Sequence, residues 1–227
     1  MAKRQPLAVV LERGEKRIFA VARDWPGWSR SGRTEEGALE ALLTYAPRYR
    51  AALRAAGIST LPPGSDAPTA IVERHRGGSG TDFGVPGVPA SRDAAPLTGP
   101  EQRRQRAILE AAWHAFDAAA RAARGRTLSV GPRGGGRNLA KMTAHVLEAE
   151  IAYLGQLGSR HAKPTPGEDE MALVRREALR TLDAVTAGTP LPNPRNTKKP
   201  WSPRYFIRRS AWHALDHAWE LEDRTPG

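Results

Sequence analysis

Residues 202–224 read SPRYFIRRSAWHALDHAWELEDR, and this stretch decides how the C-terminal half of the chain folds. Its apolar residues recur at helical spacing, and Ser202 followed by Pro203 is a typical start of an α-helix. His213 and His217 lie four residues apart, so a helix places both imidazoles on one face, about 5–6 Å apart. That spacing allows two imidazoles to bind one divalent metal ion.

The alternative to metal binding is that the spacing of His213 and His217 arose by chance. The chain has six histidines, and one pair four residues apart among six is not rare. Under that interpretation both side chains are surface residues or hydrogen-bonded core residues. His145 lies in a different predicted helix, between the apolar neighbours Met142 and Ala149, and we expect it to face inward. A third imidazole would complete the type of open three-histidine site that catalytic zinc uses, with a position left for water or substrate.

Three more amphipathic helices are predicted upstream. They cover residues 101–125, 139–157 and a segment that opens at 165–168 and stops at 188. Asn138 is a suitable cap for the second, whereas the first and third are preceded by capping-box spacings, Thr98 to Glu101 and Thr165 to Glu168. Four helices of this length predict an all-α four-helix bundle over residues 101–227.

The first 76 residues have the alternating pattern of apolar and polar residues that is typical of a small β-sheet. Short apolar runs at 7–11 and 17–22 flank a turn, residues 28–30 can add a third strand, and 70–74 a last one. Thr34 is a good cap for a helix between the third and fourth strands, and Pro47 is expected to kink or end it. The order βββαβ predicts an α+β domain over residues 1–76.

Residues 77–100 separate the two halves and contain six glycines and four prolines. This composition predicts a linker or a strapped-down loop that holds neither a helix nor a central strand.

Composition limits the function classes. The net charge is +11, but only six of the 35 basic residues are lysines and the arginines are spread along the chain, as a GC-rich genome would produce. Nucleic-acid binding is therefore the weaker interpretation. There is no cysteine, which excludes a thiolate site and a cysteine nucleophile. No apolar run approaches the length of a membrane span and no secretory signal is present, so we expect a cytoplasmic protein, with a homodimer as one option for its assembly.

Residues 17–45, RIFAVARDWPGWSRSGRTEEGALEALLTY, resemble HicB-like domains. Members of that family often place D-x-P-G after a strand and G-x-T-x-x-E-A before a helix. Matching residues here are Asp24, Pro26, Gly27, Gly32, Thr34 and Ala38. Position 37 departs from the pattern, because Gly37 stands where glutamate is common. The resemblance covers about residues 8–55 and implies an interaction or accessory module.

The segments NLAKMTAHVLEAEIAYL (138–154) and RRSAWHALDHAWELEDR (208–224) together resemble the DinB-like family of four-helix bundles. The resemblance covers about residues 101–224. It implies that His145, His213 and His217 bind a divalent metal ion, most often zinc or nickel. It also implies a thiol-dependent transferase or isomerase that uses bacillithiol, mycothiol or glutathione, or a metal-dependent hydrolase.

Since the chain has no cysteine, such a thiol would have to be an external low-molecular-weight compound, reacting with a small electrophile. Arg208 and Arg209 lie near His213 in sequence and are candidates to bind the carboxylates of a substrate or thiol cofactor. Glu148, Glu150 and Glu220 are candidates to orient the imidazoles. The alternative function is a non-enzymatic binding or scaffold module, whose HicB-like half contacts a partner or nucleic acid.

Overall fold

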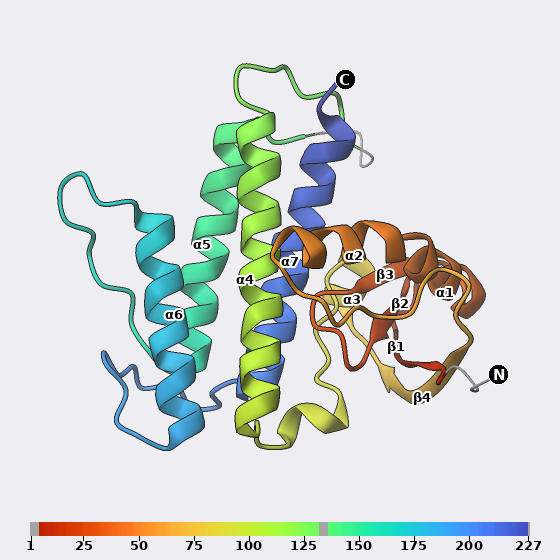
Figure 1. Cartoon of the computed structure of the whole chain (residues 1–227), viewed down its shortest axis with the longest axis horizontal. Coiled ribbons are helices and arrows are strands. Elements are labelled where there is room, and N and C mark those ends of the chain that lie inside the picture. The colour runs from red at the N-terminus through yellow and green to blue at the C-terminus, as the bar shows by residue number, and fades with distance from the viewer. Residues whose placement is uncertain (1–4, 132–135, 227) are drawn as a thin grey trace.

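A computed structural model of the chain describes residues 5–131 and 136–226. The N-terminal part is a four-stranded sheet with strand order β3-β2-β1-β4 (Figure 1). Its strands are β1 Leu7–Arg13, β2 Ile18–Ala22, β3 Ser29–Gly32 and β4 Thr69–Arg76. The pairs β1–β2 and β2–β3 are antiparallel, and β4 is parallel to β1. The predicted order of strands, with helical residues between the third and fourth, is confirmed.

The helical segment of the sheet domain is divided in two, α1 Glu35–Thr44 and α2 Ala46–Ala55. The Thr34 hydroxyl accepts a hydrogen bond from the amide of Gly37 and caps α1, as its sequence context predicts. Pro47 falls in the first turn of α2, where a missing amide hydrogen costs nothing, so the chain starts a new helix there.

The C-terminal part contains four long helices that run side by side (Figure 1). They are α4 Gly99–Ala122, α5 Leu139–Leu157, α6 Glu170–Ala187 and α7 Pro203–Arg224. Helix α7 packs against α4 and α5, and α5 also packs against α6. Asn138 caps α5 and Ser202 caps α7 through their side chains, as predicted. The α+β layout of sheet followed by helices is thus established.

Both predicted capping boxes are wrong. The side chain of Thr98 makes no capping hydrogen bond, because Glu101 instead binds the guanidinium of Arg204, far away in sequence. Glu168 accepts hydrogen bonds from the amide and hydroxyl of Thr165 in a turn that precedes α6, and Asp169 caps that helix. Glu101 thus has a distant partner, whereas Glu168 makes the predicted contact with Thr165 but in a turn that does not start the helix.

Residues 77–100 were expected to hold no helix, and this is also wrong. They form a short helix, α3 Ser79–Phe83, and a 3-10 helix, η1 Ser91–Ala94. The buried carboxylate of Glu12 on β1 explains why this segment has a defined conformation. It accepts hydrogen bonds from the hydroxyl of Thr81 and from the amides of Gly87 and Val88, and so ties this segment to the sheet.

Helix α7 is buried between the sheet and the other helices. Phe19 of β2 meets Trp212 edge-on, with ring centroids 6.2 Å apart, and Tyr45 packs on Trp219 at 5.0 Å. Gly27 has φ +86°, and a Cβ there would collide with Ala211 and Leu215 of α7. The buried side chains form two clusters, a large one that joins the sheet to the helices and a smaller one around Phe19 and Trp212, so α7 is fixed from both sides.

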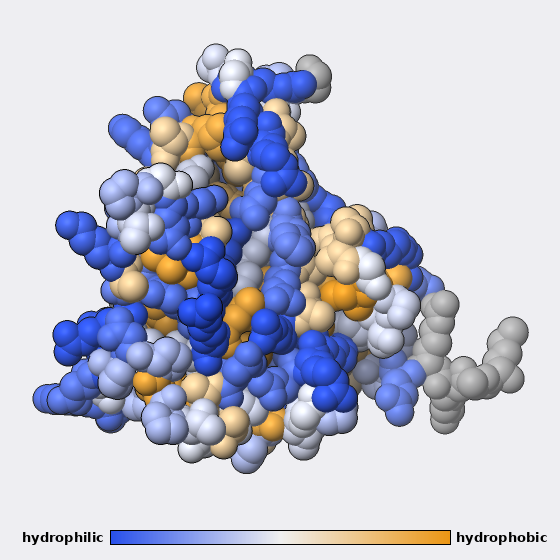
Figure 2. Space-filling model, turned by 60° about the vertical axis from the view of Figure 1, so that its left-hand side comes forward, coloured by the Kyte–Doolittle hydropathy of each residue, from blue (hydrophilic) through white to orange (hydrophobic). Residues whose placement is uncertain are grey.

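The outer surface is largely hydrophilic on the face shown in Figure 2, with small apolar patches between charged side chains. Among the described helices, none has the length and apolar character needed to cross a membrane.

A buried ion cluster joins three of the helices. Arg175 of α6 binds Glu150 of α5 through two hydrogen bonds of 2.9 and 3.0 Å, and Asp117 of α4 through bonds of 2.8 and 2.9 Å. Glu150 is only 6% exposed, and its burial raises the pKa of its carboxyl while Arg175 opposes that rise. The cluster fixes how α4, α5 and α6 pack.

Replacing Arg175 by alanine should lower the free energy of unfolding by about 3–5 kcal/mol, because Glu150 would be buried without its partner. The neighbouring variant Arg176→Ala is the control, since Arg176 is half-exposed and pairs with Glu168 at the surface. It should change stability by about 0–1 kcal/mol. Urea unfolding of both variants checks this, and equal effects would contradict the account.

Candidate metal site

Three histidines meet where α5 packs against α7. His213 and His217 lie on one face of α7, and His145 faces them from α5. One ring nitrogen from each lies within 4.8 Å of the others. The ring centroids are 4.6 Å apart for His213 and His217, and 5.2 and 5.0 Å from His145 to each of them. The three residues that the sequence predicted as ligands are therefore close enough to hold one metal ion.

Caps at both helices fix this convergence. Asn138 starts α5 seven residues before His145, and Ser202 starts α7 well before His213, so the registers of the two helices follow from local sequence. The two α7 histidines are buried, at 6% and 8% exposure, whereas His145 is partly exposed. Solvent can therefore reach the cluster at His145 on α5, whereas the two imidazoles on α7 are buried.

Hydrogen bonds indicate which nitrogens face the centre. His145 Nε2 and His213 Nε2 lie 3.3 Å apart. His217 Nδ1 lies 3.1 Å from Glu220 Oε2, and the other oxygen of Glu220 accepts a hydrogen bond from Arg224. A carboxylate on one imidazole nitrogen fixes the tautomer and leaves Nε2 of His217 free to act as a ligand.

Burial and neighbouring charges favour the neutral form of two of these imidazoles, His213 and His145. Burial lowers the pKa of His213 well below its usual value, and the neighbouring His217 lowers it further. Burial, followed by the effect of His217, also lowers the pKa of His145. The hydrogen bond from His217 lowers the pKa of Glu220, although burial opposes it. Neutral imidazole is the form that binds metals, so these shifts favour metal binding by His213 and His145.

The alternative interpretation is a histidine pair that shares one hydrogen bond between His145 and His213. Such a pair accounts for the positions of His145 and His213. It does not account for His217, whose ring is oriented by Glu220 beside the other two. The set of three imidazoles is one that zinc, nickel and copper favour. One feature departs from the usual pattern of metal sites: Nδ1 of His213 is buried and has no hydrogen-bond partner within the described residues.

The two candidate arginines have partners other than the three histidines, although the charge of Arg209 helps to lower the pKa of His213. Arg208 forms an ion pair with Asp93 of η1. Arg209 lies over the rings of Trp212 and Tyr153, at 4.6 and 5.3 Å from their centroids.

Among the three glutamates, only Glu220 hydrogen-bonds a histidine of the cluster. Glu150 is taken by Arg175, and Glu148 makes only a longer-range electrostatic contribution at His145.

Tyr153 is a neighbour of the site that the sequence analysis did not identify. Its ring meets that of His213 edge-on at 5.7 Å. The available signal was its position on the predicted helix, eight residues after His145, which places both on similar faces.

Comparisons with known proteins found no match: no protein family, no curated protein and no solved structure is similar to this chain. The DinB-like and HicB-like resemblances therefore stay predictions that rest on the motifs quoted above.

The pKa shifts predict a pH dependence of the metal-free protein. Because the folded pKa values of His213 and His145 lie below that of an unfolded histidine, about 6.5, the unfolded chain binds more protons as the pH falls below that value. The free energy of unfolding should decrease from pH 7 downward and should do so less steeply in His213→Gln. Urea titrations down to about pH 5.5, above the carboxylate range, measure both slopes. Equal slopes would show that His213 is not held neutral.

Proposed function

We propose that this protein is a metal-dependent enzyme in which His145, His213 and His217 bind one divalent ion, zinc or nickel. Its helical half would be a four-helix bundle of the DinB-like kind, and its sheet domain a HicB-like module. The function that fits best is a transferase that activates an external low-molecular-weight thiol. A hydrolase that activates water is the second option at the same site.

One observation carries the proposal: three imidazoles from two helices converge within 4.8 Å, and no carboxylate of the described residues joins the group. Three protein ligands leave an open position, which is typical of catalytic zinc rather than structural zinc. When bound there, a divalent ion lowers the pKa of a coordinated thiol or water and so supplies a nucleophile at neutral pH.

The protein groups around the histidines support that chemistry. Glu220 holds the ring of His217 in place, and Arg224 holds Glu220. The partly exposed His145 lies on the side from which a substrate can enter. The partly buried ring of Tyr153 packs edge-on against His213 and shields one side of that imidazole. A thiol substrate fits the site because the chain itself contains no thiol that would compete for the ion.

Metal content tests the site. Protein purified without a metal-binding tag and incubated with zinc or nickel should hold about one ion per chain by mass spectrometry. The double variant His213→Ala/His217→Ala should lose it, because a single remaining imidazole cannot retain the ion. His114→Ala is the matched control, since His114 is an exposed histidine on α4. Circular dichroism verifies that each variant is folded, and metal retained by the folded double variant would contradict the proposal.

Spectroscopy of cobalt-loaded protein separates the thiol and water options. Glutathione or N-acetylcysteine added to the Co²⁺ form should produce a sulfur-to-cobalt charge-transfer band in the near ultraviolet, since the open position accepts a thiolate. The double histidine variant should give no band. Cobalt bound by the wild type with no band from either thiol would favour the hydrolase.

A further inference from the structure

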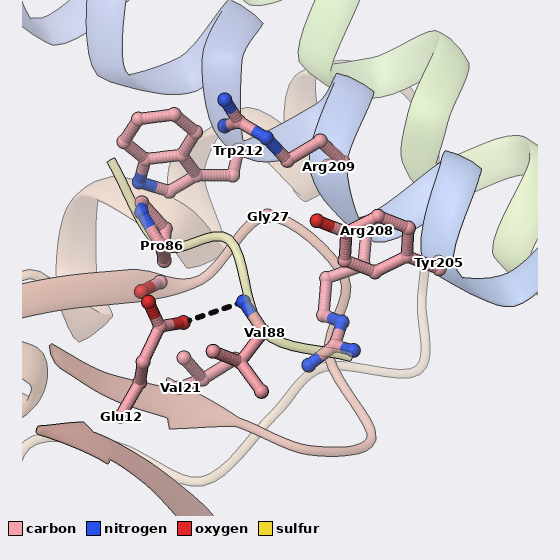
Figure 3. A pocket seen from close by; sticks show the side chains of 10 residues that line it. Glu12, Val21, Gly27, Pro86, Val88, Tyr205, Arg208, Arg209 and Trp212 are labelled. Atoms are coloured by element: carbon pink, nitrogen blue, oxygen red, sulfur yellow. Dashed lines mark hydrogen bonds between the residues drawn. The ribbon is translucent and has the colours of Figure 1, made fainter. Parts of the chain in front are cut away.

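Two arginines of α7 border a narrow cavity between this helix and the sheet (Figure 3). The guanidinium groups of Arg208 and Arg209 point apart in this view. Asp93 pairs with Arg208, and the carboxylate of Glu12 lies in the lining, so two carboxylates balance two guanidinium groups. A third arginine of the helix, Arg224, is connected to the histidines instead.

Arg224 is the last residue of α7, and its side chain is only 4% exposed. Its Nη1 donates a hydrogen bond of 2.9 Å to Oε1 of Glu220. The other oxygen of that carboxylate, Oε2, lies 3.1 Å from Nδ1 of His217. Because the two contacts use different oxygens, Glu220 is held from both sides. Arg224 thus reaches one candidate metal ligand through a single intervening side chain.

The same guanidinium also holds the backbone that leads into α5. Its Nε donates a hydrogen bond of 2.9 Å to the carbonyl of Ser129, and its Nη2 one of 3.0 Å to the carbonyl of Arg137. Both carbonyls belong to the connection between α4 and α5. Arg137 comes directly before Asn138, which caps α5 seven residues ahead of His145. Arg224 therefore holds the start of the helix that carries a second candidate ligand.

The fit between Arg224 and this connection is close. A Cβ at position 136, where the chain has Gly136, would collide with the guanidinium of Arg224. In the opposite direction, the amide of Ser129 donates a hydrogen bond of 2.8 Å to the carbonyl of Arg224, and its hydroxyl lies 3.2 Å from the same oxygen. Side chain and backbone of one residue thus bind the same segment. The planar fork of arginine, with donors in fixed directions, suits such a role, and lysine cannot reproduce it.

A simpler explanation is that Arg224 only stabilises the end of α7, since a cation near the C-terminus of a helix is favourable. Arg48 of α2 offers the comparison, because it binds Glu222 and Asp223 in the same turn of α7. Within the described residues, no hydrogen bond connects those two carboxylates to the three histidines. An effect that Arg224 has and Arg48 lacks therefore separates a role at the metal site from a role at the helix end.

We propose that Arg224 is a positioning residue of the metal site, which orients His217 through Glu220 and, by fixing the start of α5, also sets the position of His145. Its effect on metal affinity rests on the proposed function, whereas its effect on the ring of His217 is a property of the metal-free protein. A carboxylate held from behind keeps the proton of His217 on Nδ1 and leaves Nε2 as the ligand atom.

Long-range ¹H–¹⁵N NMR spectra of metal-free protein show which nitrogen of an imidazole carries the proton. They are recorded at about pH 8, where an ordinary histidine is neutral, and comparison with His217→Gln assigns the signals of His217. The wild type should have the proton on Nδ1 alone. Folded Arg224→Gln should also contain the form protonated on Nε2, because Glu220 has lost the group that holds it. Arg48→Gln is the control and should match the wild type.

Competition with a chelator measures zinc affinity. Arg224→Gln should bind zinc about 10–100-fold more weakly than the wild type. Arg224→Lys keeps the charge but not the fork, so it should lie between the two. Arg48→Gln removes a half-exposed ion pair and should stay within about twofold of the wild type.

A double variant tests the link to α5. If Arg224 acted through Glu220 alone, adding Arg224→Gln to Glu220→Gln would not weaken zinc binding further. Because Arg224 also holds the carbonyls of Ser129 and Arg137, the double variant should bind zinc about threefold or more weakly than Glu220→Gln.

Circular dichroism identifies the folded variants, and Arg224→Lys provides the decision if Arg224→Gln does not fold. An unchanged tautomer of His217 in the folded Arg224 variants would overturn the proposal. Wild-type zinc affinity in those variants, a loss equally large in Arg48→Gln, or a double variant no weaker than Glu220→Gln would also overturn it. A wild-type protein that binds no zinc would contradict the proposed function, and the tautomer measurement alone would then decide the role of Arg224.

Discussion

The packing of helix α7 on two sides is the constraint on which the rest of the structure depends. Successive residues of a helix point about 100° apart, so Trp212 reaches the sheet while His213 reaches α5. Gly27 allows the sheet to approach closely enough for this contact, since a side chain there would strike Ala211. The candidate metal site and the cavity between α7 and the sheet are both consequences of this arrangement. The first needs α5 and α7 in register, and the second needs the sheet held against α7.

Most buried charges in this protein are compensated. Glu150 has Arg175, Glu101 has Arg204, and Glu12 has three hydrogen-bond donors. The exceptions on α7 include Nδ1 of His213, Nη1 of Arg209 and Nε1 of Trp212. Buried polar atoms without a hydrogen-bond partner within the described residues also occur elsewhere, at Nε1 of Trp113 and at the hydroxyls of Ser159 and Ser210, so such an atom does not by itself mark a functional site.

The sequence predicted what local rules control and failed where distant residues decide. Local spacing predicted the order of the strands along the chain and the helix caps Thr34 and Asn138. It also predicted the three histidines, because the register of a helix determines which face each side chain occupies. The first capping box failed where a distant residue intervenes, because the carboxylate of Glu101 binds Arg204, about a hundred residues away. The helix within residues 77–100 depends on Glu12 in the same manner. The role of Arg209 stays a prediction, and the cavity beside it is built from segments far apart in sequence and has no sequence signature.

The central claim is that three imidazoles form one metal centre. X-ray absorption spectroscopy at the metal edge, on protein loaded with a single equivalent of zinc or nickel, tests it most directly. The account predicts multiple-scattering features of three imidazole ligands, with nitrogen or oxygen donors completing the shell and no sulfur until a thiol is added. A bound ion surrounded by oxygen alone, or by a single imidazole, would contradict it and return the three histidines to the role of a hydrogen-bonded cluster in the helical core.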